Sequence, residues 1–257
     1  MRHKKIFLIG LVLIISILMI PFTKVFSQSN SEYSWYFVSR GKNTTPEAPK
    51  ESASFLSETD SYFLGDTSKK EIFLTFDEGY ENGNTEKILD ILKETNVKAT
   101  FFVVKPYITS YPNLIKRMVD EGHIVGNHSS KHLSMPTLTN EAFNKEFKDV
   151  EDAYRDVTGK EIPKFFRPPM GKYSKDSLIK TKELGYKSIF WSFAYRDWLV
   201  NSQPSPEEGK KKILSSVHPG CIMLLHAVSD TNVKILKDVL TTLQNEGYTF
   251  KTLNDLP

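Results

Sequence analysis

Short apolar runs alternate with amphipathic stretches along the chain after residue 70. The apolar runs are dense in β-branched and aromatic residues, which predicts strands. They span residues 71–76, 98–104, 124–125, 164–166, 188–193, 221–225 and 248–250. Between them, apolar residues recur at helical spacing, which predicts helices over residues 84–96, 112–121, 140–157, 175–184, 206–216 and 232–246. Strands that alternate with helices form parallel sheets, and about seven such units favour an α/β fold built as a distorted (β/α) barrel.

The first 27 residues differ from the rest of the chain. Residues 2–5 (Arg-His-Lys-Lys) precede an uncharged apolar stretch over residues 6–22. This order is typical of a secretory signal, and the stretch is nearly as long as the roughly 20 residues that span a bilayer. Residues 1–27 are therefore predicted to be a signal peptide, cleaved after Ser27, or an uncleaved membrane anchor. Either way the rest of the chain is expected outside the cytoplasm, because the positive charges stay inside.

Two further parts follow this segment. Residues 28–69 are rich in Ser, Thr, Asn, Glu and Pro, and predict a linker or N-terminal extension with a short ordered segment at residues 33–38. Residues 70–257 carry all the predicted units and are expected to form one globular domain. The protein would then contact a membrane only through its first 27 residues.

The overall composition excludes several classes of protein. Hydrophobic residues make up 39% of the chain, which is enough for a sizeable core. The 34 Lys and Arg against 31 Asp and Glu give a net charge of +3, too even to predict nucleic-acid binding. The single cysteine, Cys221, lies in an apolar run, so no disulfide forms within the chain and a buried thiol is expected. No G-x-S-x-G segment is present to indicate a serine hydrolase.

Polar residues that can titrate or bind metal follow five of the predicted strands. In parallel barrels the active site lies at the carboxyl ends of the strands, so we expect these side chains to meet. They are Asp77 and Glu78 after the first strand, His128 and His132 after the third, Arg167 after the fourth, Asp197 after the fifth and His226 after the sixth.

The two histidines after the third strand are candidate metal ligands. His128 and His132 are four residues apart, so on a helical turn they would share a face and could hold one ion. Two imidazoles and a carboxylate from the acidic pair make a catalytic set that leaves room for water and substrate. A divalent ion is therefore expected; Zn²⁺ fits this set, and other transition ions would fit too.

Five segments in order resemble the motifs of the NodB-homology polysaccharide deacetylases, which form carbohydrate esterase family 4. They are residues 75–79 (Thr-Phe-Asp-Glu-Gly, for T-F-D-D-G), 128–132 (His-Ser-Ser-Lys-His), 167–171 (Arg-Pro-Pro-Met-Gly), 197–198 (Asp-Trp) and 224–226 (Leu-Leu-His). The resemblance covers residues 70–257. It implies a distorted barrel of the NodB-homology type and a metal-dependent hydrolase that removes acetyl groups from N-acetylated amino sugars.

The resemblance also implies a role for each catalytic residue. Asp77 would be the general base that takes a proton from water, and Arg167 would orient it and hold it ionised. His226 would be the general acid that protonates the departing amine, since an amide nitrogen leaves poorly until it is protonated. Asp197 would keep His226 charged, because a neighbouring carboxylate raises the pKa of a histidine.

The metal and the substrate would be held by further motif residues. Glu78, His128 and His132 would hold the ion, although position 78 is Glu where most of the family has Asp, which leaves displaced geometry or weaker binding as the alternative. On the substrate side, the oxyanion would be met by a backbone N–H near Met170, and the acetyl pocket would be lined by Trp198 and Leu224.

Residues 80–83 (Tyr-Glu-Asn-Gly) narrow the resemblance to the delta-lactam-biosynthetic de-N-acetylases, or PdaA-type enzymes, of spore-forming bacteria. That branch implies N-acetylmuramic acid as substrate, in peptidoglycan strands whose stem peptide an N-acetylmuramoyl-L-alanine amidase has removed. The freed amine can condense with the lactyl carboxylate to give the muramic δ-lactam of spore cortex. Arg167 and Lys172 are the candidate cations for that carboxylate.

Two other functions stay open. The first is deacetylation of N-acetylglucosamine in peptidoglycan or of chitooligosaccharides. The second is glycan binding without turnover, if Glu78 has spoiled the metal site.

Overall fold

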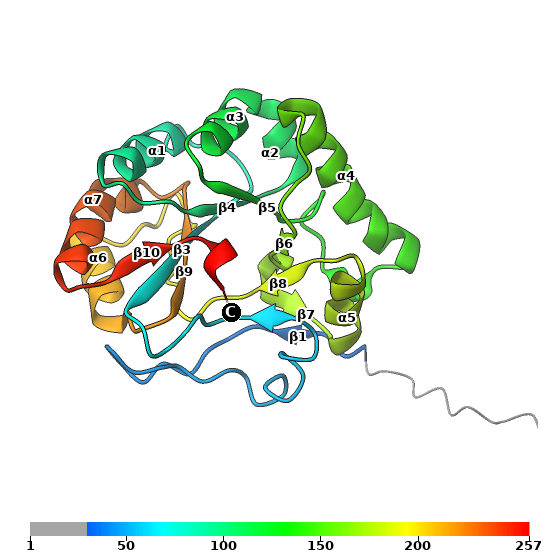
Figure 1. Cartoon of the computed structure of the whole chain (residues 1–257), viewed down its shortest axis with the longest axis horizontal. Helices are drawn as coiled ribbons and strands as arrows, with labels where there is room; N and C mark the ends of the chain where they lie inside the picture. Colours follow the sequence, from blue (N-terminus) through cyan, green and yellow to red (C-terminus); the bar gives the residue numbers. More distant parts are fainter. Residues whose placement is uncertain (1–29, 257) are drawn as a thin grey trace, which may run out of the picture.

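The computed structural model describes residues 30–256 (Figure 1). The predicted signal or anchor over residues 1–27 lies outside these described residues. Between residues 30 and 256, no helix is both long and apolar enough to cross a membrane.

A curled parallel sheet forms the centre of the fold. Its strands are β3 (Glu71–Glu78), β4 (Thr100–Val103), β5 (Ile124–Asn127), β6 (Phe165–Phe166), β8 (Lys187–Ile189), β9 (Cys221–His226) and β10 (Thr249–Lys251). The sheet runs in the order β10-β3-β4-β5-β6-β8, and β9 also pairs with β3. A parallel bridge between Phe193 and Met223 joins the segment after β8 to β9, so the sheet curls back towards its start. The predicted distorted (β/α) barrel is confirmed.

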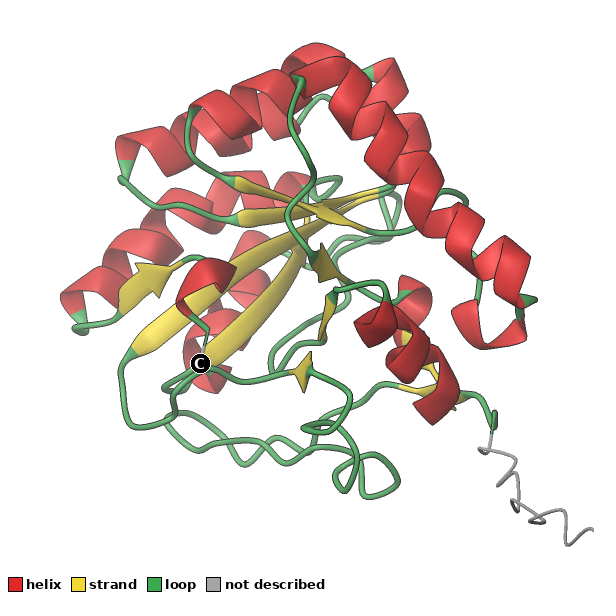
Figure 2. Cartoon of the chain, turned by 45° about the vertical axis from the view of Figure 1, so that its right-hand side comes forward, coloured by secondary structure: helices red, strands yellow, loops and turns green. Residues whose placement is uncertain are grey.

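Helices cover the outer side of this sheet, as Figure 2 shows. They are α1 (Thr85–Glu94), α2 (Lys105–Ser110), α3 (Pro112–Asp120), α4 (Asn140–Thr158), α5 (Lys175–Glu183), α6 (Pro206–Ser216) and α7 (Asp230–Asn245). Local signals set their ends: the Ser205 side chain caps α6 in a capping box, and α4 ends at Gly159 in the left-handed conformation. All six predicted helices are present, and α2 is a seventh that the apolar pattern did not predict.

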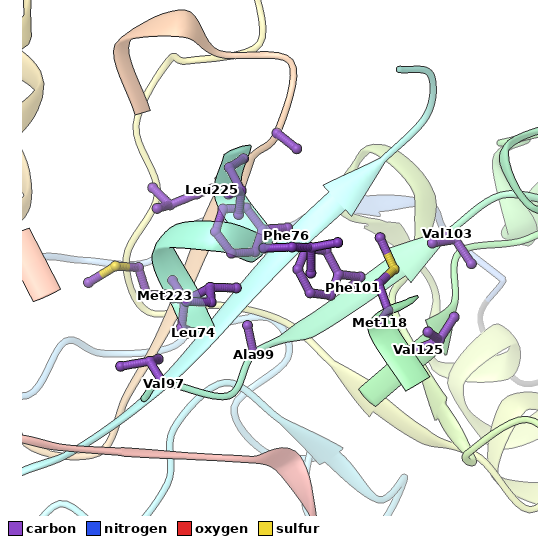
Figure 3. Close-up of a cluster of buried hydrophobic side chains, with 14 of the residues drawn as sticks. Leu74, Phe76, Val97, Ala99, Phe101, Val103, Met118, Val125, Met223 and Leu225 are labelled. Atoms are coloured by element: carbon purple, nitrogen blue, oxygen red, sulfur yellow. The ribbon is translucent and has the colours of Figure 1, made fainter. Parts of the chain in front are cut away.

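The two faces of β3 point into different surroundings. Leu74 and Phe76 face the outer helices, in the apolar cluster that includes Phe101 (Figure 3). Phe73, on the opposite face, packs with Phe102 inside the barrel. Because side chains alternate along a strand, this arrangement fixes the direction of every later side chain of β3.

The N-terminal extension packs along the side of the barrel that the helices leave open, drawn in blue at the lower edge of Figure 1. In this extension, β1 (Tyr33–Ser34) pairs antiparallel with β7 (Lys172–Tyr173), and β2 (Ser61–Tyr62) pairs parallel with β8. The ring of Trp35 stacks on Phe190 with centroids 4.2 Å apart, and Phe55 is buried in the same cluster. Residues 30–69, predicted as a linker with one short ordered segment, thus cover the barrel over most of their length.

Candidate active site

A cleft of about 870 Å³ opens at the carboxyl ends of the strands. It lies where a parallel barrel places its site. The predicted site residues that line it are Asp77, His128, His132, Met170, Trp198, Leu224 and His226. Arg167 and Asp197 lie directly behind this wall, and each contacts one of the lining residues.

Asp77 and Arg167 form a buried ion pair at the base of the cleft. The Arg167 Nη1 donates to Asp77 Oδ1 at 2.8 Å, and the same nitrogen donates to the Thr75 hydroxyl. Arg167 is fully buried, and its Nε donates to the carbonyl oxygen of Ile189. Burial alone would raise the pKa of Asp77, but the charges of Arg167 and of nearby histidine rings outweigh it and leave that pKa below its usual value. Asp77 is therefore ionised and held in one orientation.

His128 presents a free ring nitrogen to the cleft. Its Nδ1 lies 2.8 Å from the carbonyl oxygen of Arg167, which can only accept, so Nδ1 carries the proton. Burial lowers the pKa of His128 to about 4, so the ring is neutral at pH 7. Its Nε2 lies 3.6 Å from Asp77 Oδ2 and keeps a lone pair. This is the protonation state that a metal-binding imidazole needs.

His132 is brought to His128 by a loop, and the helical turn predicted from the four-residue spacing is absent. Ser129 and His132 have left-handed backbone, with φ of 67° and 56°, and the Ser129 hydroxyl accepts a hydrogen bond from the His132 N–H. The two imidazole rings meet edge to face with centroids 4.9 Å apart. His132 keeps one side open to solvent, yet burial of its ring lowers its pKa. Both histidines are thus neutral and adjacent.

Glu78 does not join the two histidines. It follows Asp77 on β3, so its side chain points to the opposite face of the strand, towards the outer helices. Glu78 is fully buried, does not line the cleft, and has no hydrogen-bond partner for either carboxyl oxygen. Burial, followed by the charges of Glu81 and Asp77, raises its pKa well above the usual value, so it is a neutral acid.

The donor set therefore fits a divalent ion only in part. Two neutral imidazoles, His128 and His132, are placed side by side as ligands require. The carboxylate expected from Glu78 is missing from this set, and nowhere between residues 30 and 256 do three His, Cys, Asp or Glu side chains converge to hold a metal. The sequence resemblance implied three protein ligands, and strand alternation at positions 77 and 78 supplies two.

His226 and Asp197 form the second charged pair of the site. The Nδ1 of His226 lies 2.7 Å from Asp197 Oδ1, and the His226 backbone N–H donates to Asp197 Oδ2 at 2.8 Å. Burial alone would lower the pKa of His226, but the hydrogen bond and charge of Asp197 outweigh it and raise that pKa. His226 is also the register partner of Asp77, so the two lie at one level of the sheet. A proton donor thus faces the cleft beside an ionised carboxylate.

The predicted substrate-side residues form the cleft wall. Met170 is half exposed and has left-handed backbone, with φ of 58°, in a turn that follows Arg167. The Trp198 ring packs against His226 with centroids 5.5 Å apart, and Leu224 is buried beneath the cleft.

Three site residues escaped the sequence analysis. Asn232 donates from Nδ2 to Asp197 Oδ2 at 2.7 Å and to the carbonyl oxygen of His226, and its Oδ1 accepts from the Tyr195 hydroxyl. Arg196 lines the cleft directly before Asp197. Its position next to a motif residue was a usable signal, whereas nothing in the pattern around Asn232 indicated a contact with Asp197.

Comparison with known proteins agrees with this geometry. A family model described as polysaccharide deacetylase matches residues 64–189. The peptidoglycan-N-acetylmuramic acid deacetylase PdaA of Bacillus subtilis is 42% identical over 227 residues, which cover 88% of this chain and 86% of that protein. The solved structure of B. subtilis PdaA, a family 4 carbohydrate esterase, matches with a TM-score of 0.86 and covers 88% of this chain and 97% of the other.

Two further relatives bracket the substrate. A family 4 carbohydrate esterase from Bacillus anthracis matches in structure with a TM-score of 0.76 at 40% identity, covering 90% of this chain and 98% of the other. A peptidoglycan-N-acetylglucosamine deacetylase of Bacillus cereus is 32% identical over 195 residues, which cover 74% of this chain and 70% of that protein.

Proposed function

We propose that this chain, which belongs to the polysaccharide deacetylase family, removes the acetyl group of N-acetylmuramic acid in peptidoglycan strands that lack the stem peptide. The observation that carries the proposal is the pairing of two oppositely tuned groups in one cleft. Asp77 is held ionised by Arg167, and His226 is held protonated by Asp197. Amide hydrolysis needs such a base and such an acid together. The name and the 42% identity of B. subtilis PdaA support muramic acid as the substrate.

Each step then falls to a named residue. Asp77 accepts a proton from the water that attacks the acetyl carbonyl carbon. A backbone N–H of the turn around Met170 meets the carbonyl oxygen as it becomes an oxyanion. His226 gives its proton to the amide nitrogen, the C–N bond breaks, and acetate and the free amine leave. The Trp198 ring and Leu224 enclose the acetyl methyl group.

A divalent ion, with Zn²⁺ the best fit to imidazole donors, belongs to this proposal through His128 and His132. When bound, it would supply polarisation of the acetyl carbonyl and a lower pKa for water. His128 is oriented for this role by its hydrogen bond to the Arg167 carbonyl, which ties the ligand to the same residue that holds Asp77.

The surrounding biology follows from the product. The freed amine and the lactyl carboxylate of one sugar can condense with loss of water, which gives a muramic δ-lactam. An N-acetylmuramoyl-L-alanine amidase must act first to free the carboxylate. We place the protein outside the cytoplasm, in contact with the cell wall during spore-cortex formation.

The test is mass spectrometry of peptide-free peptidoglycan strands after incubation with the protein. Parallel incubations contain added Zn²⁺, a chelator, or the Asp77→Asn variant. We expect acetyl loss from muramic acid that the chelator and the substitution abolish, and a further loss of water would report lactam closure.

Two other outcomes correspond to the alternatives. Acetyl loss from N-acetylglucosamine instead would assign the activity of the B. cereus relative. No mass change on either sugar, with glycan binding retained, would leave a binding protein.

A further inference from the structure

Arg196 differs from the other arginines of the described chain in having no partner. Four of the five arginines between residues 30 and 256 are ion-paired: Arg40 with Glu47, Arg117 with Asp90, Arg155 with Glu161 and Arg167 with Asp77. Arg196 is exposed, lines the cleft, and makes no hydrogen bond or ion pair with any residue of that range. A guanidinium that is left free beside a reaction site is available to an anionic group of the substrate.

The cations proposed from sequence for this purpose are already engaged. Arg167 is fully buried and bound to Asp77. Lys172 is paired with Glu32 of the N-terminal extension at 2.7 Å. Neither is free to bind a carboxylate of the substrate.

The charge along the cleft is positive once these pairs are counted. Asp77 is the one acidic residue among those that line the cleft, and Arg167 compensates its charge. Two lining cations remain without a partner among the described residues, Arg196 and Lys131. An anion that enters the cleft therefore meets attraction from its walls and no uncompensated negative charge.

The position of Arg196 matches the chemistry of muramic acid. Arg196 stands directly before Asp197, whose carboxylate is fixed by three hydrogen bonds to His226 and Asn232. Two residues further on, Trp198 packs on the ring of His226. The lactyl ether of muramic acid is on the carbon next to the one that carries the acetamido group. A substrate whose amide nitrogen reaches His226 thus brings its lactyl carboxylate to the same part of the cleft.

We propose that Arg196 binds the lactyl carboxylate of peptide-free N-acetylmuramic acid and so determines which strands the enzyme accepts; this inference rests on the proposed function. When the stem peptide is attached, the carboxylate is an amide and carries no charge. N-acetylglucosamine has no lactyl group at all. Arg196 therefore selects against both, and its planar fork suits a carboxylate better than a lysine does.

The experiment compares two forms of one substrate. Peptide-free strands are used as they are, or after their lactyl carboxylates have been converted to methylamides. The intact protein and its Arg196→Ala, Arg196→Lys and Lys131→Ala variants are assayed for kcat/KM on both forms and on N-acetylglucosamine oligomers. Strand binding is measured separately by calorimetry, because binding can be read even without turnover.

We expect Arg196→Ala to lower kcat/KM on the free-carboxylate strands about tenfold, mainly through KM. This is the low end for a hydrogen-bonded charge, since Arg196 is exposed. On methylamide strands and on N-acetylglucosamine oligomers, the variant and wild type should agree within about twofold. Arg196→Lys should recover part of the loss, and Lys131→Ala should leave the preference for the free carboxylate in place.

The outcomes separate this inference from the proposed function. An unchanged preference for free carboxylate in Arg196→Ala would overturn the inference while deacetylation stands, as would a loss of preference in Lys131→Ala alone. If no strand is deacetylated but tight binding still requires both the free carboxylate and Arg196, the proposed function fails and the assignment of Arg196 holds.

Discussion

Replacing Glu78 with methionine is expected to stabilise the protein and leave its activity intact. The Glu78 side chain is fully buried and neither carboxyl oxygen has a hydrogen-bond partner. A buried polar group without a partner costs about 1–3 kcal/mol. Methionine has a similar length, is apolar and adapts to irregular space. We therefore expect a gain of about 2 kcal/mol in the free energy of unfolding, or about 4–8 °C in Tm for a domain of this size.

The assay is urea and thermal unfolding of wild type, Glu78→Met and Glu78→Gln. The glutamine variant is the matched control, because it keeps two polar atoms in the same unpaired place; we expect its stability to remain within about 1 kcal/mol of wild type.

The pH dependence of stability gives a second readout. The pKa of Glu78 is raised above its ordinary value of 4.5, so the unfolded chain loses this proton first. Wild-type stability should then fall as pH rises above 4.5, by about 1.4 kcal/mol per pH unit while Glu78 stays protonated in the fold. This contribution is absent from Glu78→Met.

The same variant tests the placement of Glu78 against the family motif. The side chain points away from the cleft, so kcat/KM and bound zinc should be unchanged in Glu78→Met. Loss of zinc together with activity would show that Glu78 reaches the two histidines, and the structural reasoning would be refuted. A lower Tm than wild type would refute the energetic part alone.

Three further predictions concern the cleft. Asp197→Asn removes the charge that raises the pKa of His226; activity is lost as pH rises through that pKa, so the alkaline limb of a kcat/KM profile should move to lower pH, and an unmoved limb would exclude His226 as the acid. Arg167→Met leaves Asp77 buried without its cation, and we expect a loss of about 3–5 kcal/mol in urea unfolding as well as of turnover; a fully stable variant would contradict this. Gly171→Ala adds a Cβ at a φ of 65° and 2.8 Å from a tryptophan ring, so thermal unfolding should show a loss of at least about 1 kcal/mol, whereas an unchanged Tm would mean that the turn relaxes.

Periodicity and strand ends predicted most of the fold and most of the candidate site. Apolar runs located the strands because each is buried, and the carboxyl-end rule brought Asp77, His128 and His226 to one cleft. The error over Glu78 was avoidable, since consecutive residues of a strand point to opposite faces.

Other features were not available from the sequence. The left-handed backbone at Ser129 and His132 carries no signature, because neither residue is glycine. The packing of Trp35 on Phe190, and the contact of Asn232 with Asp197, join residues far apart in the chain. No local pattern reports such pairings.

The N-terminal extension also has a consequence for the order of assembly. Its strands β1 and β2 pair with β7 and β8, roughly 130 residues further along the chain. A chain leaves the ribosome N-terminus first, so Trp35 and Phe55 emerge long before the surfaces that bury them have been made. Sealing of the barrel is therefore a late step that waits for distant partners, and until then an aromatic strip remains open to a chaperone or an export factor.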